Sequence, residues 1–307
     1  MFNDKRFQNC VLKNRPTLTT CREYVNISKS NSEEKMERIA IIADIHSNLQ
    51  ALKAVLKNIK EQGIEKIICL GDIIGKGQNA HECVQLVKKY CQIVVAGNTD
   101  KRFSGDAEPF KEDKVEYGRI KWNRSLLTQD DVDFLQAIPF SYEFEVGGKL
   151  VRFFHATPKS MFDFVNSFEK DLGKNYAMFL PSENTMSQKI ADVVIYGHLH
   201  YPFLTTIYNK TLICCGSVGL STSYIQNEQR NSSPEEITKA HYVVMSIDND
   251  QSLSYQFVSV KYDKQKEIAS NTQNPELETF KTEIEQGIYR NMQRTIKTLE
   301  DKGFENI

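Results

Sequence analysis

The sequence has no long apolar run, no Cys-x-x-Cys pair and almost no net charge. Its longest apolar stretches, Ile39 to Ala43 and Val193 to Tyr196, fall far short of the ~18 residues that a membrane span needs. Thirty-nine Lys and Arg against forty Asp and Glu give a net charge of −1, which disfavours both a strongly basic nucleic-acid binder and an acidic disordered chain. The seven cysteines contain no Cys-x-x-Cys pair, so a reducing cytoplasm is the simpler interpretation. We expect a cytoplasmic globular protein without membrane contacts.

The chain divides into three segments of different pattern. Residues 1–35 are rich in Asn, Ser and Thr without lasting periodicity, and we expect a flexible extension outside the core, with Met36 as an alternative start of the natural chain. Residues 36–265 alternate strand and amphipathic helix, which predicts an α/β domain with parallel strands. Asn274-Pro275-Glu276 predicts the start of a long amphipathic helix that ends near Gly303, so residues 266–307 are expected to pack on the domain as a C-terminal helix.

Periodicity within the central segment indicates individual elements. Asn48 and Asn79 are expected to cap two amphipathic helices. The region from Thr99 to Gly148 is charged and helical, and predicts a cap insertion at about residues 101–148. The expected strands are 38–43, 66–70, 92–96, 149–154, 192–196, 203–208, 211–215, 241–247 and 253–260.

Seven oxygen or nitrogen donors stand directly after expected strands. The carboxyl ends of strands are where α/β sheets place their ligand sites, so these side chains should converge in space. A single histidine after a strand is more often a structural residue than a ligand, but seven donors in this order favour a metal centre. The donors are Asp44, His46, Asp72, Asn98, His155, His198 and His200.

The donors belong to five short motifs that resemble those of the calcineurin-like metallophosphoesterase superfamily, D-x-H, GD, GN, H and G-H-x-H. The resemblance covers about residues 36–262, and the flanking residues are similar to the small bacterial phosphodiesterase branch. It implies a four-layer α/β/β/α sandwich with two mixed sheets. In chain order the motifs are Asp44-Ile45-His46, Gly71-Asp72, Gly97-Asn98, His155 and Gly197-His198-Leu199-His200.

The resemblance also implies the chemistry. Asp72 would bridge two divalent ions, with Asp44, His46 and His200 on one ion and Asn98, His155 and His198 on the other. Water held between the ions would become the hydroxide that attacks phosphorus, so no protein nucleophile is required. Asp72 and Asn98 would act in catalysis, and Asn98 would also contact substrate. Carboxylate, amide and imidazole donors without thiolate suit Mn, Fe or Zn, and we prefer Mn²⁺.

The third motif departs from the pattern of many phosphatases in the superfamily. Where those have a histidine that protonates the leaving group, this sequence has Thr99, whose hydroxyl is far too weak an acid. His81 is an improbable substitute because it lies in an expected helix. The departure favours substrates with a stable leaving group, such as phosphoanhydrides or activated diesters. Lys76, in a Gly-flanked loop, is a candidate contact for a substrate phosphate, and Lys101 and Arg102 are weaker candidates.

These features predict a metal-dependent hydrolase of small phosphodiesters or nucleotide polyphosphates. A nuclease is the first alternative, but the net charge offers no broad basic footprint. A protein phosphatase is the second, and the expected cap favours a small ligand instead. A non-enzymatic scaffold of the same fold would show lost ligands, whereas all seven positions are filled here. The sequence does not indicate the oligomeric state.

Overall fold

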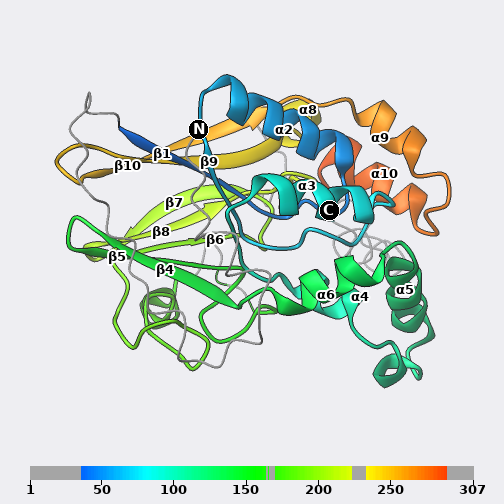
Figure 1. Ribbon diagram of the computed structural model, residues 1–307, viewed down its shortest axis with the longest axis horizontal. Helices are drawn as coiled ribbons and strands as arrows, with labels where there is room; N and C mark the ends of the chain where they lie inside the picture. Colours follow the sequence, from blue (N-terminus) through cyan, green and yellow to red (C-terminus); the bar gives the residue numbers. More distant parts are fainter. Residues whose placement is uncertain (1–35, 164, 166–169, 223–232, 289–307) are drawn as a thin grey trace, which may run out of the picture.

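The computed structural model describes residues 36–163, 165, 170–222 and 233–288, and its described strands form two five-stranded sheets stacked face to face (Figure 1). The first sheet has the order β10-β9-β1-β2-β3, and β1 pairs parallel with β2 and antiparallel with β9. Both directions occur, so the sheet is mixed. Its strands are β1 (Glu37–Ile42), β2 (Lys66–Cys69), β3 (Ile93–Val94), β9 (Ala240–Ile247) and β10 (Leu253–Val260).

The second sheet has the order β4-β5-β6-β8-β7 and is also mixed. Its three central strands run parallel, and each edge strand pairs antiparallel with its neighbour. The strands are β4 (Ser141–Val146), β5 (Lys149–Phe154), β6 (Val193–Tyr196), β7 (Pro202–Ile207) and β8 (Lys210–Cys215).

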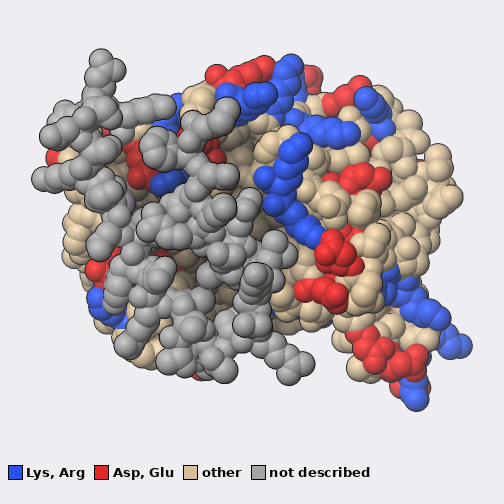
Figure 2. Space-filling model, viewed as in Figure 1, with Lys and Arg blue, Asp and Glu red and all other residues tan. Residues whose placement is uncertain are grey.

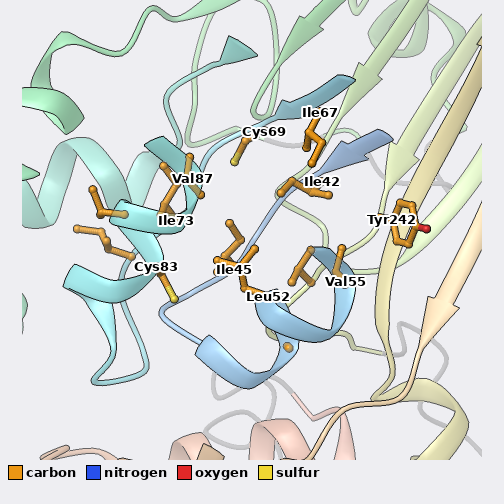
Figure 3. Packing of buried hydrophobic residues seen from close by; sticks show 14 of the residues in the cluster. Ile42, Ile45, Leu52, Val55, Ile67, Cys69, Ile73, Cys83, Val87 and Tyr242 are labelled. Atoms are coloured by element: carbon orange, nitrogen blue, oxygen red, sulfur yellow. The ribbon is translucent and has the colours of Figure 1, made fainter. Parts of the chain in front are cut away.

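The alternation of side chains along β1 explains the layers. Ala40 and Ile42 point to one face and pack with the helices outside the first sheet, where Figure 3 shows Ile42 beside Leu52 and Val55 of α2. Ile39 and Ile41 point to the other face and join a cluster between the two sheets. A third cluster covers the outer face of the second sheet. The four-layer α/β/β/α sandwich expected from the sequence is therefore confirmed.

The helices surround the sheets and gather at one end. α2 and α3 cover the outer face of the first sheet, while α4 to α6 and α9 to α10 lie beyond its carboxyl ends (Figure 1). Asn48 caps α2 as predicted, because its side chain accepts a hydrogen bond from the Ala51 N–H. The described helices are α2 (Leu49–Glu61), α3 (Ala80–Tyr90), α4 (Asn98–Ser104), η1 (Glu108–Phe110), α5 (Lys114–Ser125), α6 (Gln129–Ala137), α7 (Leu172–Ala177), α8 (Pro234–Ile237), α9 (Lys264–Ser270) and α10 (Leu277–Gln286).

The helical insertion ends earlier than the sequence analysis expected. Residues 141–146, placed there within the cap, form β4, an edge strand of the second sheet. The segment alternates polar and apolar residues, and Gly147 and Gly148, both with positive φ, turn the chain into β5. The sequence therefore contains a hairpin signal, because Tyr142 and Phe144 alternate with polar residues before a Gly-Gly turn. The prediction of a helical cap did not take this signal into account.

The C-terminal helix is also shorter than expected. α10 ends at Gln286 because Gly287 takes a left-handed φ of 69°, which ends helices, and a separate helix, α9, precedes it. α10 packs on the domain through Phe280 and Ile284. The remainder of the predicted helix and the predicted N-terminal extension, 289–307 and 1–35, lie outside the described residues.

Two sequence-based expectations on environment can be compared with the structure. Among the described residues, no helix combines the length and apolar character needed to cross a bilayer. Five cysteines in the described part of the chain are free thiols. The cytoplasmic location itself stays a prediction.

Candidate metal centre

The seven predicted donors lie together at the carboxyl ends of the central strands. Six of them form two groups of three. Within each group, the candidate ligand atoms lie within 4.8 Å of one another. The first group is Asp44, His46 and His200, and the second is Asp72, His155 and His198. The seventh donor, Asn98, places its Oδ1 3.0 Å from Nε2 of His155, in the second group.

Asp72 lies between the two groups. Its Oδ1 is 3.4 Å from Nε2 of His155, and its Oδ2 is 3.6 Å from Nε2 of His46. One carboxylate thus directs one oxygen to each group. This is the arrangement that a ligand shared by two cations requires.

Several of these residues adopt a backbone conformation that L-amino acids rarely take. Five of the seven donors have a left-handed φ, between 50° and 69°. This conformation raises the conformational energy of residues other than glycine. It persists where the surrounding structure enforces it, and such residues cluster at functional sites. The five are Asp44, His46, Asp72, His198 and His200.

Backbone hydrogen bonds between loops enforce these conformations. The N–H of Asp44 donates to the Gly71 carbonyl at 3.0 Å, and the N–H of His46 donates to the Asp72 carbonyl at 2.9 Å. The loops after β1 and β2 are therefore joined directly. Gly97 completes the contact, because a Cβ there would lie 2.1 Å from the backbone nitrogen of Asp72.

Two histidines are oriented by backbone carbonyls. Nδ1 of His155 lies 2.8 Å from the Leu70 carbonyl, and Nδ1 of His200 lies 2.8 Å from the Leu220 carbonyl. A carbonyl only accepts, so each Nδ1 carries a hydrogen and donates it. In the neutral ring this leaves the Nε2 lone pair directed at the other donors, which is the tautomer that binds a metal.

The electrostatics of the site follow from burial and from the two carboxylates. Burial, together with the neighbouring His200, lowers the pKa of His46 to about 3, and burial beside His155 lowers the pKa of His198 to about 4. Burial opposes the charged form of His155, but the Asp72 carboxylate outweighs it and raises that pKa to about 9. The pKa of Asp72 lies far below its usual range: burial alone would raise it, but the neighbouring His155 and other histidines outweigh this. The carboxyl groups of Asp44 and Asp72 both have a lowered pKa, and with the neutral imidazoles of His46 and His198 they favour binding of a cation.

The donor set fits divalent cations. Oδ1 of Asp44 is fully buried with no hydrogen-bond partner among the described residues, and it lies 3.5 Å from Nε2 of His200. An unpaired buried carboxylate oxygen is costly unless a cation satisfies it. Nε2 of His46 and Nε2 of His200, 3.0 Å apart, converge on the same space. Oxygen and imidazole donors without thiolate suit transition-metal divalent ions.

Lys76 makes a contact that the sequence analysis did not anticipate. Its Nζ forms a 2.7 Å ion pair with Glu283 of α10, and both side chains are largely buried. The structure thus shows Lys76 in contact with α10, and its contact with a substrate phosphate stays a prediction. The Gly75-Lys76-Gly77 loop could not predict this contact, because its partner in α10 is about two hundred residues away in the chain.

The remaining candidates contact residues other than the seven donors. Nζ of Lys101 donates to three carbonyls at the end of α6, so its role is to hold the cap. His81 lies 2.7 Å from Asp131 of α6, away from the seven donors. Arg102 contacts Glu116 and two phenyl rings. In the described part of the chain, these contacts of the three side chains do not include any of the seven donors.

Asp100 is a functional residue that the sequence analysis did not single out. Its Oδ1 accepts from the Ile73 N–H at 2.8 Å and its Oδ2 accepts from the Gly97 N–H at 3.0 Å. It thereby joins the loops that carry Asp72 and Asn98. Burial, reinforced by the Asp72 carboxylate, raises the pKa of Asp100 to about 6. The sequence offered one signal for this role, because an acidic residue in the first turn of a helix often accepts hydrogen bonds from backbone N–H groups at the helix start.

Comparison with known proteins identifies the family. Residues 37–233 match the model of the calcineurin-like phosphoesterase superfamily domain. An uncharacterized protein of Methanocaldococcus jannaschii is 33% identical over 233 residues, which cover 74% of this chain and 89% of that protein. The crystal structures of a metallophosphoesterase from Sphaerobacter thermophilus and of a hypothetical protein from Pyrococcus horikoshii each superpose with a TM-score of 0.62 at 21% identity, covering 83% of this chain and all of theirs.

The structural neighbours show the same fold, and the family match extends over most of the chain. All residues of the two donor groups lie within the matched region. The chain belongs to the calcineurin-like phosphoesterase superfamily and is a metal-dependent hydrolase of phosphate esters.

Proposed function

We propose that the protein hydrolyses small phosphodiesters or nucleotide polyphosphates, such as dinucleoside polyphosphates, with two divalent ions, preferably Mn²⁺, and that it acts in the cytoplasm. The observation that carries the proposal is the convergence of two donor groups on Asp72, next to a third motif that has no histidine. Complete donor groups favour an enzyme over a scaffold of the same fold.

The assignment of the donors follows the geometry. Asp44, His46 and His200 would hold one ion, Asn98, His155 and His198 would hold the other, and Asp72 would be shared. Two such ions, when bound, supply Lewis acidity toward a phosphoryl oxygen and lower the pKa of bound water.

The chain's own groups orient these ligands. The N–H of Thr99 donates to Oδ1 of Asp72 at 2.9 Å and fixes the carboxylate between the two groups. The carbonyls of Leu70 and Leu220 fix two imidazoles. Asn98, at the first turn of α4, directs Oδ1 toward His155, which leaves its amide N–H groups as candidate donors to a phosphate oxygen.

The substrate class follows from the missing acid. The Thr99 hydroxyl donates to the Ile74 carbonyl at 2.9 Å, so this proton is engaged in the structure, and an aliphatic hydroxyl is in any case too weak an acid. A leaving group would depart as its own anion. Phosphates and nucleotides leaving from an anhydride, and activated alcohols leaving from a diester, meet this requirement.

The surface supports a small substrate rather than a polynucleotide. In the described part of the face shown in Figure 2, Lys and Arg lie among Asp and Glu over the helices. A nuclease is expected to present a broader basic track. The cap formed by α4 to α6 stands beside the donors, since Asn98 begins α4, which favours a small ligand over a folded protein substrate.

The proposal is tested with chelator-stripped protein reconstituted with Mn²⁺, Zn²⁺ or Fe²⁺. We expect hydrolysis of bis(p-nitrophenyl) phosphate and of diadenosine tetraphosphate, much slower hydrolysis of alkyl monoesters, and no activity in the stripped protein. Asp72→Asn is the matched control, because it keeps the side-chain size and removes the shared charge. Hydrolysis restricted to phosphoproteins or to long nucleic acids would contradict the proposal.

A further inference from the structure

The guanidinium of Arg102, near the end of α4, lies over two phenyl rings. Its central carbon is 5.1 Å from the ring centroid of Phe162 and 5.8 Å from that of Phe110. Glu116 of α5 holds the guanidinium by a hydrogen bond of 3.0 Å. These contacts hold the guanidinium in place, and it supports the Phe162 ring by a cation–π contact.

This arrangement adjoins the second donor group from two directions. Arg102 follows Asn98 by four residues in α4, so the two lie one turn apart on the same face of the helix, about 6 Å along its axis. Phe162 lies in the loop that follows His155. Asn98 and His155 are 3.0 Å apart, so the helix that carries Arg102 and the loop that carries Phe162 both start at the second donor group, and the two side chains then meet each other.

The loop that carries Phe162 is held in shape by its own hydrogen bonds. The Thr157 N–H donates to the Ser160 carbonyl at 3.0 Å, and the Ser160 N–H donates to the Thr157 hydroxyl at 3.0 Å. The Phe162 N–H donates to the Ser160 hydroxyl at 3.1 Å. A ring placed by such a turn loses little freedom when a ligand binds.

The ring also remains open to a ligand. Phe162 is 50% exposed, although it is a large apolar side chain that rests on a well-positioned cation. Glu116 balances the charge of Arg102, so the pair of side chains offers a flat stacking surface rather than a phosphate-binding charge. Flat aromatic surfaces next to phosphate sites suit nucleobases, because every base has a π-face.

We propose that Phe162, supported by Arg102, stacks on the nucleobase of a nucleotide whose phosphate lies at the donor groups. The inference rests on the proposed function and narrows its substrates to nucleotides. Phe162 and Arg102 set specificity and take no part in the chemistry.

The test compares two ligands that differ only in the base, AMP and ribose 5-phosphate, by calorimetric titration of the Mn²⁺-loaded protein. We expect the wild type to bind AMP about 10-fold more tightly than ribose 5-phosphate. Phe162→Leu, which keeps an apolar side chain without the flat face, should remove this preference and leave the affinity for ribose 5-phosphate unchanged. Arg102→Lys, which keeps the charge but not the plane, should weaken AMP binding by about 3-fold.

Tyr208→Leu is the matched control. Tyr208 is a 77% exposed aromatic residue just beyond β7, about 20 Å along the strand from the donors, and its replacement should change neither affinity. Equal affinity of the wild type for AMP and ribose 5-phosphate, absence of AMP binding, or equal weakening of both by Phe162→Leu would overturn the inference. Hydrolysis of methyl p-nitrophenyl phosphate, which has no base, tests the proposed function separately, so the two cannot be confused.

Discussion

Thr99 and Ile74 are joined by a 2.9 Å hydrogen bond from the Thr99 hydroxyl to the Ile74 carbonyl. The same threonine donates its backbone N–H to Asp72, so it ties the start of α4 to the loop that carries the shared carboxylate. The position where many relatives are expected to hold a general acid is here a structural connection between two loops.

This connection predicts a steep dependence of rate on the leaving group. Without a proton donor, kcat/KM over a series of aryl and alkyl diesters should fall steeply as the leaving-group pKa rises. Thr99→His should selectively accelerate the hydrolysis of esters with poor leaving groups. We expect an acceleration of up to ~10²-fold, which is the lower end of the range for general-acid catalysis. Thr99→Ser, which keeps a hydroxyl, is the control. A flat dependence in the wild type would mean that another group already supplies the proton.

The Lys76–Glu283 pair predicts a coupling between α10 and the loop after Asp72. Removing one partner leaves a buried charge uncompensated, so Glu283→Gln should lower the free energy of unfolding by about 3 kcal/mol. The double variant Lys76→Met/Glu283→Leu should recover most of that loss. Denaturant unfolding of the three proteins measures both values.

The same variants separate two roles of Lys76. If Lys76 only holds α10, the double variant keeps a wild-type KM for phosphodiesters. An increase in KM that persists in the double variant despite its recovered stability would restore the substrate-contact role expected from the sequence.

Gly97→Ala should damage the site through a close approach rather than through backbone strain. A Cβ at this position would lie 2.1 Å from the nitrogen and from Oδ1 of Asp72, and neither backbone can yield without moving the shared ligand. We expect a loss of Mn²⁺ from the protein and at least a ~10²-fold loss of kcat/KM. Gly118→Ala, in α5 with open space around it, is the control and should be neutral or slightly stabilising. Normal metal content in Gly97→Ala would refute this account of the loop contact.

Removal of the ions should destabilise the fold, because ligands that bind only the native state stabilise it by mass action. At a free Mn²⁺ concentration of about 100 times Kd, the effect is roughly 2.7 kcal/mol. For a domain of this size that corresponds to a fall in Tm of about 5 to 10 °C on chelation. Differential scanning calorimetry with and without EDTA measures it, and an unchanged Tm would argue against structural coupling of the ions.

The sequence predicts the donors well because each follows a strand and belongs to a short motif. It predicts less about what surrounds them. The left-handed backbone of Asp44 or His198 is enforced by contacts between loops distant in the chain, and the modest preference of Asp and His for this conformation could not predict it. The partner of Lys76 belongs to α10, about two hundred residues away. β4 was overlooked although its alternation and Gly147-Gly148 turn are local signals.

The central claim is that seven side chains hold two ions that share Asp72, and metal content measures it most directly. Protein reconstituted with Mn²⁺, freed of excess ions and analysed by inductively coupled plasma mass spectrometry should contain about two ions per chain. Asp72→Ala should retain fewer than one and lose diester hydrolysis, with circular dichroism like that of the wild type. One ion or none in the active wild-type protein, or two in a folded Asp72→Ala protein, would contradict the account.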